Sequence, residues 1–228
     1  MMINVVSFLL FTFLIQTHAW AITPYEVMDR VEERYDVSDI QADFVQETFL
    51  KAMNITETAS GRVYFKRPDM IRWHYRSPEE QLIVSDGRTL WLYQPQERQV
   101  MVGRSESCFG NRKGISLIMD FNELRKEFIF SWATPTTEEE KKNTHNEGCY
   151  LVRLTPKNQR PDMVSLILHI SRTTFDVVKS ITQGPFGDTI AMSFYNFRFN
   201  QGLKKDFFVL DMPEDVDIIR LEGDDHHD

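Results

Sequence analysis

The sequence lacks the residue patterns that most enzymes and metal sites require. It has no G-x-S-x-G, P-loop or H-E-x-x-H motif and no paired-cysteine metal spacing. None of its six histidines is spaced as a metal ligand, and His74 and His169 fall on expected strands as surface or hydrogen-bonded core residues. We therefore predict no catalysis, no cofactor and no metal; the enzymatic alternative is a hydrolase without a recognised motif.

Positive charge is also in short supply. There are 26 Lys and Arg against 34 Asp and Glu, a net charge of −8. This balance argues against nucleic acid as a partner and against general attraction to anionic lipid. The charge mainly serves solubility, and we expect the acidic, His-containing tail 222–228 to be disordered.

Long hydrophobic runs are missing as well. The apolar run Val5–Ile15 covers about eleven residues, whereas a membrane-spanning helix needs about 20. An A-x-A site, Ala19-Trp20-Ala21, follows it, so residues 1–21 are predicted to be a cleaved signal peptide. No cysteine stands at this site, which predicts an exported, soluble protein that is not itself lipidated.

No internal repeat or linker divides the rest of the chain. A length of 228 residues is compatible with one β-rich domain, so we expect residues 22–228 to form a single unit. Apolar residues make up 42% of the sequence and include 17 phenylalanines, enough for a large core or a cavity.

Residues 61–100 carry the clearest structural pattern. Short apolar-rich runs are separated by Pro68-Asp69, Ser77-Pro78 and Asp86-Gly87. In the first two runs, apolar residues alternate with mostly basic ones, a period of two that predicts strands with one apolar face and one basic, wet face. The apolar members are Val63, Phe65, Ile71, Trp73 and Tyr75.

The Asp86-Gly87 dipeptide predicts a tight hairpin. A two-residue loop would pair Ser85 with Arg88, and hence Ile83 with Leu90. One face then holds Ile83, Leu90 and Leu92, and the other holds Leu82, Val84, Trp91 and Tyr93. Because both faces are apolar, both must be covered. Helices could cover one face and a hydrophobic ligand the other, or the sheet could belong to an ordinary two-layer core.

Arg67 interrupts the alternation. Counting by twos from Val63 and Phe65 places it on the apolar side, where an unpaired guanidinium is costly. This placement requires a three-residue connection, Pro68-Asp69-Met70, so that Arg67 faces Ile71. We expect the charge to have a partner there, and a reversible partner would make Arg67 a switch.

Two helices and further strands are expected. Thr23, Pro24 and Glu26 form a capping box with proline at the first helical position, which predicts an amphipathic helix over 24–36 that either packs on the sheet or acts as a lid. Apolar spacing predicts a second helix over about 116–127. The expected strands are 40–50, 58–66, 149–155, 163–171, 174–182, 189–199 and 206–210.

The two cysteines are expected to form a disulfide, because an exported protein meets an oxidising compartment. A bond between Cys108 and Cys149 would close a loop of about 42 residues and stabilise the fold by roughly 4 kcal/mol in the chain-entropy model. We expect it to be a local staple and not part of the function.

These residues together resemble a known family, the outer-membrane lipoprotein carrier proteins (LolA). The resemblance is dense over residues 40–100 and thinner elsewhere. It rests on Phe44-x-Gln46, Gly61, Lys66-Arg67-Pro68, Arg72-Trp73-x-Tyr75, Pro78, Gln81, Val84-Ser85-Asp86-Gly87, Trp91-x-Tyr93-x-Pro95 and Gln99-Val100, then on Leu154-Thr155-Pro156-Lys157, Gly187-Asp188-Thr189, Asn200, Leu203, Phe208 and Asp211-x-Pro213.

The resemblance implies an α+β fold, an incomplete, half-open antiparallel β-barrel whose hydrophobic concave face is covered by lid helices. It implies a periplasmic, monomeric chaperone that receives lipidated proteins from an inner-membrane ABC transporter and carries them to the outer membrane, to a receptor if one is present. Arg67 would hydrogen-bond the lid in the closed state. The expected cavity residues are Val63, Phe65, Ile71, Trp73, Ile83, Leu90 and Leu92.

The resemblance leaves one alternative of a different class. The same fold could serve as a module without a transport role, such as an envelope-stress sensor or a glycolipid binder.

Overall fold

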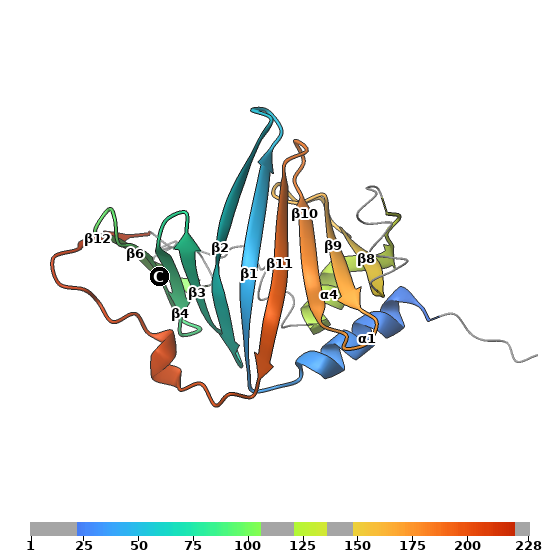
Figure 1. Ribbon diagram of the computed structural model, residues 1–228, viewed down its shortest axis with the longest axis horizontal. Coiled ribbons are helices and arrows are strands. Elements are labelled where there is room, and N and C mark those ends of the chain that lie inside the picture. Colours follow the sequence, from blue (N-terminus) through green and yellow to red (C-terminus); the bar gives the residue numbers. More distant parts are fainter. Residues whose placement is uncertain (1–21, 106–120, 136–147, 222–228) are drawn as a thin grey trace, which may run out of the picture.

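A computed structural model describes residues 22–105, 121–135 and 148–221. Its described strands form one sheet with the order β12-β6-β5-β4-β3-β2-β1-β11-β10-β9-β8-β7, in which β12 and β7 are the two edges. All neighbours are antiparallel except β12 and β6, which are parallel. The sheet is curved but not closed, and two helices lie at its β7–β10 half (Figure 1). The predicted half-open antiparallel barrel is confirmed.

One half of the sheet is a meander. Its strands are β1 (Asp39–Leu50), β2 (Ile55–Lys66), β3 (Met70–Ser77), β4 (Gln81–Ser85), β5 (Thr89–Gln94) and β6 (Gln99–Arg104). The other half contains β7 (Phe128–Trp132), β8 (Cys149–Pro156), β9 (Ser165–Ser171), β10 (Val177–Gln183) and β11 (Thr189–Phe199). The chain returns from β11 to the first half, where β12 (Asp217–Arg220) pairs with β6.

Helix α1 (Pro24–Tyr35) begins as its sequence predicts. The Glu26 amide donates to the Thr23 hydroxyl, and the Glu26 carboxylate accepts from the Thr23 amide, so the capping box is complete. Helix α4 (Phe121–Glu127) coincides with the described part of the second predicted helix. Residues 116–120 of that prediction lie outside the described part of the chain.

The hairpin at Asp86-Gly87 differs from its prediction. Ser85 pairs with Leu90 and Ile83 pairs with Leu92, so the loop has four residues instead of two. The Asp86 carboxylate accepts hydrogen bonds from the amides of Arg88 at 2.8 Å and Thr89 at 2.7 Å, which widens the turn. The register shifts by two residues, and a shift of two leaves every side chain on its predicted face.

The connection from β2 to β3 also differs. Phe65 pairs with Ile71 and Lys66 with Met70, so Arg67 is the first residue of a three-residue turn and does not face Ile71. The Arg67 amide donates to the Ser38 carbonyl at 3.0 Å instead of joining the β2–β3 ladder, and Pro68 has no amide hydrogen to donate. The ladder therefore ends one pair earlier than predicted.

The C-terminal segment covers the convex face of the meander. Instead of the strand predicted over 206–210, residues Lys205–Phe208 form a short 3-10 helix, η1. Arg72 donates to the Phe207 carbonyl at 3.0 Å and lies over its ring, so the predicted wet, basic face is partly covered. Further along, Leu210 packs with Val84 and Val100 in a buried cluster.

The bend from β11 into this segment is anchored by Asp39. Its carboxylate accepts from the amides of Gln201 at 2.6 Å, Gly202 at 3.1 Å and Leu203 at 3.3 Å. Burial acts to raise the pKa of Asp39, but these bonds and one from the Ser38 hydroxyl together lower it. A charged Asp39 thus fixes where the chain crosses to the convex face.

Candidate functional site: an apolar concave face with a helix at one end

The predicted cavity residues share one face of the sheet. Cross-strand pairs link Val63 to Trp73, Trp73 to Ile83 and Ile83 to Leu92, and another joins Phe65 to Ile71. Leu90 lies two residues before Leu92 on the same strand and therefore on the same face. The register brings all seven residues to the concave side.

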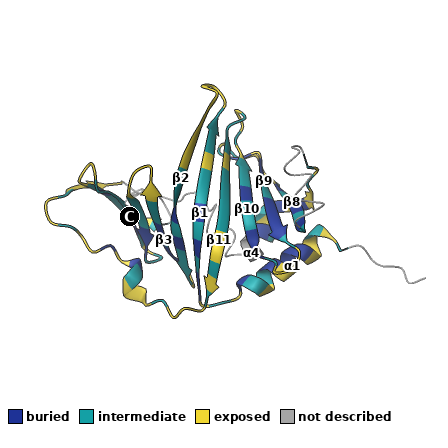
Figure 2. Cartoon of the chain, viewed as in Figure 1, coloured by how far each residue is buried: buried dark blue, intermediate teal, exposed yellow. Residues whose placement is uncertain are grey.

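A central cluster occupies the middle of this face. Its buried members are Ala42, Phe44, Val63, Ile71 and Trp73, all at most 4% exposed, and the partly buried Phe65 and Ile83 pack against them. Leu90 is buried and Leu92 is half-buried; both lie on β5, nearer the β12 edge, and neither belongs to the central cluster. Figure 2 shows burial along the strands of this region.

Our prediction from the sequence missed the contributions of β1 and β11. Phe44 packs edge-to-face on Trp73 with ring centroids 4.7 Å apart, and Met192, Phe194 and Phe197 lie against the cluster. The alternation of Ile40, Ala42 and Phe44 in the predicted strand 40–50 carried the signal for β1. The pairing of β1 with β11, which brings Phe194 opposite Phe44, spans about 150 residues and has no local signature.

Trp73 has an unusual polar environment. It is 1% exposed and contacts the rings of Phe44, Phe65, Tyr75 and Phe194. The structure gives its indole nitrogen Nε1 no hydrogen-bond partner. Leaving such a donor buried and unpaired costs about 1–3 kcal/mol. The centre of the concave face is therefore apolar at some cost to stability.

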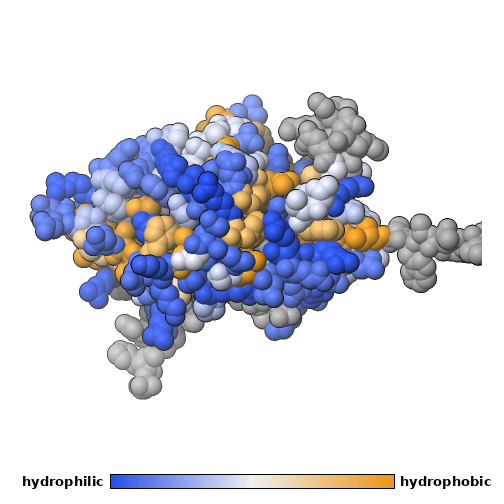
Figure 3. Space-filling view, turned by 60° about the horizontal axis from the view of Figure 1, so that its bottom comes forward, coloured by the Kyte–Doolittle hydropathy of each residue, from blue (hydrophilic) through white to orange (hydrophobic). Residues whose placement is uncertain are grey.

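Helix α1 covers the β7–β10 end of the same face. Its residues Val27, Met28, Val31 and Tyr35 are at most 5% exposed and pack with Leu154 and neighbouring side chains of the sheet. Figure 3 shows hydrophobic residues gathered in a band across the middle of the molecule, bordered by hydrophilic surface.

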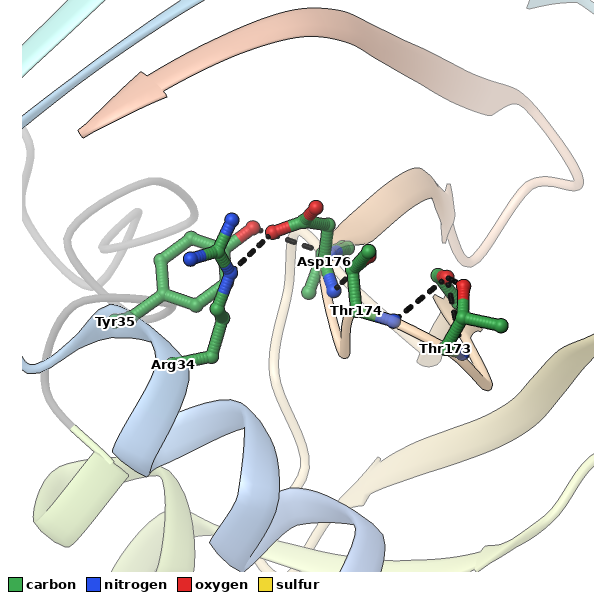
Figure 4. Close-up of polar contacts among 7 residues, drawn as sticks. Arg34, Tyr35, Thr173, Thr174 and Asp176 are labelled. Atoms are coloured by element: carbon green, nitrogen blue, oxygen red, sulfur yellow. Dashed lines mark hydrogen bonds and ion pairs between the residues drawn. The ribbon is translucent and has the colours of Figure 1, made fainter.

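Polar contacts hold the C-terminal end of α1 to the turn between β9 and β10 (Figure 4). Arg34 Nε donates to Asp176 Oδ1 at 2.8 Å, and the Tyr35 hydroxyl accepts from the Val177 amide at 3.0 Å. Burial raises the pKa of Tyr35 far above its ordinary value, so the phenol stays neutral. The turn is itself ordered, because the Asp176 amide donates to the Thr174 hydroxyl.

Arg67 contacts the same end of α1 from the other side. Its Nη2 donates to the carbonyl of Tyr35 at 3.1 Å, and its Nε donates to the carbonyl of Val37 at 3.2 Å. The Tyr35 carbonyl is among the helix's last acceptors, which lack partners within the helix, and a cation there also complements the helix dipole. The side chain is 41% exposed, so water can replace these bonds when they break.

A third arginine joins the two helices. Arg125 of α4 donates through Nη2 to the carboxylates of Asp29 and Glu32 on α1. These hydrogen bonds raise the pKa of Arg125. Helix α1 is therefore connected to β9–β10, to the β2–β3 turn and to α4 by separate arginine contacts, all near the surface.

A polar pocket of about 280 Å³ lies beside the central cluster, at the end away from α1. Tyr75 and Gln46 form part of its wall, and the Tyr75 hydroxyl donates to Gln46 Oε1 at 3.0 Å. Burial raises the pKa of Tyr75 to about 12, so it remains a donor at neutral pH. The rest of the wall is mostly glutamine and glutamate side chains from the β3–β4 and β5–β6 connections.

The predicted disulfide remains a prediction. Cys149 is buried at the start of β8, while Cys108 lies outside the described residues. Within the described ranges, no helix is both long and apolar enough to cross a membrane. Nor do the described His, Cys, Asp and Glu side chains form a group suited to hold a metal ion.

The fold and this face define a class: an open β-barrel protein with an apolar concave face and a helix packed over one end. The sequence model of the family "Outer membrane lipoprotein carrier protein LolA" matches residues 36–211. The chain belongs to this family.

Individual relatives agree with the family match. An outer-membrane lipoprotein carrier protein of Nitrosomonas europaea is 29% identical over 180 residues, covering 79% of this chain and 82% of the relative. One from Azotobacter vinelandii is 26% identical over 212 residues, covering 91% and 96%. An uncharacterised conserved protein of Thermus thermophilus has a similar fold, with a TM-score of 0.55, 15% identity and coverage of 86% and 98%.

Proposed function

We propose that this protein is a periplasmic carrier that binds the acyl chains of lipidated proteins on its concave face and takes them to the outer membrane. The observation that supports this most is the continuous apolar face, rich in aromatic rings, that one helix covers at its end. The names of the curated relatives point the same way. The carrier would perform no reaction of its own.

The physical need for such a face can be estimated. An acyl chain of about 16 carbons gains roughly 12 kcal/mol by leaving water, at about 0.8 kcal/mol per CH₂. A lipidated protein cannot cross an aqueous compartment against that force without an apolar surface of comparable size. The carrier receives its cargo from an inner-membrane ABC transporter and gives it to the outer membrane, directly or through a receptor.

Arg67 supplies a means of release in this proposal. Its two bonds, to the last carbonyl of α1 and to the Val37 carbonyl just beyond the helix, are charge-assisted, and such bonds are worth about 1.5–3 kcal/mol each. They would stabilise the closed, empty state, so a bound acyl chain that moves α1 would have to break them. The loaded carrier is then held at a higher free energy and gives up its cargo readily.

The test is loading. The protein is expressed in the periplasm of a Gram-negative host, purified without detergent, and bound lipidated proteins are identified by mass spectrometry. Wild type should carry triacylated or diacylated proteins, and Leu92→Glu, which places a charge on the half-buried edge of the concave face, should carry far fewer. Arg88→Leu, in the exposed turn before β5, is the control and should load as wild type does. Absence of acylated proteins from folded wild type would contradict the proposal.

A further inference from the structure

The most exposed large apolar side chain among the described residues lies at the tip of a hairpin. Phe186, in the turn between β10 and β11, is 83% exposed, and Met53, in the turn between β1 and β2, is 62% exposed. Figure 1 shows these two turns side by side, standing above the rest of the sheet. Single exposed hydrophobic residues need no explanation, but two on neighbouring tips form a patch.

The two tips are fixed to each other. The Lys51 amide donates to Asp188 Oδ1 at 2.8 Å. Gly187 has φ +89°, and a Cβ there would lie 2.6 Å from Cδ of Lys51, so the lysine stem packs directly over the glycine. The patch is therefore presented by two braced hairpins and not by a free loop.

The patch continues into the concave face. Leu50 pairs with Ile55, and Ile190 pairs with Thr48, so all four lie on the concave side by register. Ile55 and Ile190 are each 42% exposed, and Met192, two residues beyond Ile190, packs against the central cluster. Ile55, Ile190 and Met192 thus lead from the tips to the predicted acyl site, and Thr48, Gln46 and the exposed Glu57 are the polar residues beside them on this face.

The shape and charge of the tips favour a lipid surface over a protein partner. A stable protein interface buries about 1,200–2,000 Å² in total, far more than two hairpin turns offer. Residues 50–57 and 183–190 contain one lysine, Lys51, against the two acids Glu57 and Asp188, so anionic lipid gives no added attraction. Apolar and aromatic side chains on a projecting tip suit insertion among the headgroups of a zwitterionic bilayer.

We propose that the paired tips, with Phe186 and Met53 at their ends, dock the protein on a phospholipid surface, so that the apolar residues leading from the tips join the bilayer to the concave face. This inference extends the proposed carrier function, since it gives the acyl chain a path that avoids water. Docking itself needs no cargo and can be measured on the empty protein.

The test is flotation of the purified mature protein with phosphatidylcholine vesicles at low and high salt. Wild type should float, and Phe186→Ser and Met53→Ser should each lower the partition coefficient about tenfold, because a buried apolar side chain is lost from the lipid. Salt should change little. Ile218→Ser is the control, because Ile218 is also exposed, at 53%, but lies on β12 far along the sheet order; this variant should float as wild type does.

The outcomes that overturn the inference are distinct from failure of the carrier function. It is wrong if folded wild type does not float, if Ile218→Ser lowers flotation as much as Phe186→Ser, or if gel filtration shows that Phe186 instead joins two copies of the chain. Binding of a fluorescent fatty acid without vesicles is measured on the same variants. Its retention in Phe186→Ser, with flotation lost, separates docking from acyl binding.

Discussion

The two halves of the sheet are packed differently. Under α1, aliphatic and aromatic side chains from the helix and from β7–β10 interdigitate, and most are fully buried. In the meander half, the central cluster is equally buried, but its members among the described residues all come from strands and include an unpaired indole N–H. In the proposed function, the first half supplies stability and the second supplies the apolar face for the acyl chain.

The contacts around α1 fit this division. Its apolar face is buried like any core helix, but its polar attachments are surface arginine contacts to Asp176, to the Tyr35 and Val37 carbonyls, and to Asp29 and Glu32. Ion pairs at the surface are individually modest, and water can replace the bonds of a partly exposed arginine when they break. In the proposed function, α1 would have to give up these contacts and its apolar packing to leave the concave face while the sheet stays folded.

The largest expected effect is on the β7–β10 half. Leu154 is fully buried against α1, so Leu154→Ala should lower the free energy of unfolding by about 2–5 kcal/mol. Urea unfolding followed by circular dichroism measures this. Fatty-acid binding by the remaining folded protein should not be lost; a loss of more than about threefold, on the order of 0.6 kcal/mol, would mean that the two halves do not divide stability from binding.

The second-largest effect is expected from removing the hydrogen bonds of Arg67. Arg67→Leu should accept lipidated protein normally but transfer it to acceptor membranes at least about tenfold less, since the closed state loses bonds worth more than about 1.4 kcal/mol. Transfer from loaded carrier to outer-membrane vesicles is the measurement, with Arg88→Leu as control. A folded Arg67→Leu that cannot load would show that Arg67 binds the cargo or its donor, contrary to the role given to it above.

A smaller effect is expected at Asp39. Asp39→Asn keeps the shape but replaces one acceptor oxygen facing the amides of Gln201, Gly202 and Leu203. Unfolding free energy should fall by about 1–3 kcal/mol, with fatty-acid affinity unchanged. An unchanged midpoint of urea unfolding would mean that the crossing segment is held by other contacts.

The smallest effect concerns pH. Hydrogen bonds lower the pKa of Asp39 despite burial, and the bond from Arg62 lowers that of Asp43, both from 3.8. As pH falls below this value, the unfolded chain takes up protons that the folded chain still refuses, so stability decreases until the folded carboxylates protonate. Unfolding measured at steps below pH 3.8 should show a steeper loss in wild type than in Asp39→Asn. If stability falls equally with pH in wild type and in Asp39→Asn, Asp39 does not cause the loss of stability at low pH.

The sequence predicted the faces of this fold better than its pairings. Ile83, Leu90 and Leu92 lie together as predicted although the hairpin register is shifted by two, because a shift of two residues preserves the side on which each residue lies. The Asp86 carboxylate decides the loop length, and its hydrogen bonds form only in the folded turn. Helix α1 was predictable because the residues that cap it, Thr23 and Glu26, are close together in the sequence.

Other features depend on distant segments and could not be predicted locally. Strands β6, β7 and β12 were not predicted, and residues 206–210 were wrongly assigned to a strand. Phe208 is fully buried because η1 packs on the convex side of β3, a tertiary contact that overrides the local β-propensity. The family resemblance predicted that Arg67 bonds to a lid helix, but not which atoms accept. Tyr35, one of its partners, lies 32 residues earlier in the chain, so no local pattern links the two.

The position of α1 relative to the β2–β3 turn tests the central claim most directly. Spin labels carried by unnatural amino acids at Glu33 and Asp69, both exposed, leave the native cysteines in place. Pulsed electron resonance should give one short distance in the empty protein and a longer one when an acylated protein is bound, with the longer distance already present in empty Arg67→Leu. A distance that stays the same in all three samples would contradict the account, because α1 would then be a fixed part of the core.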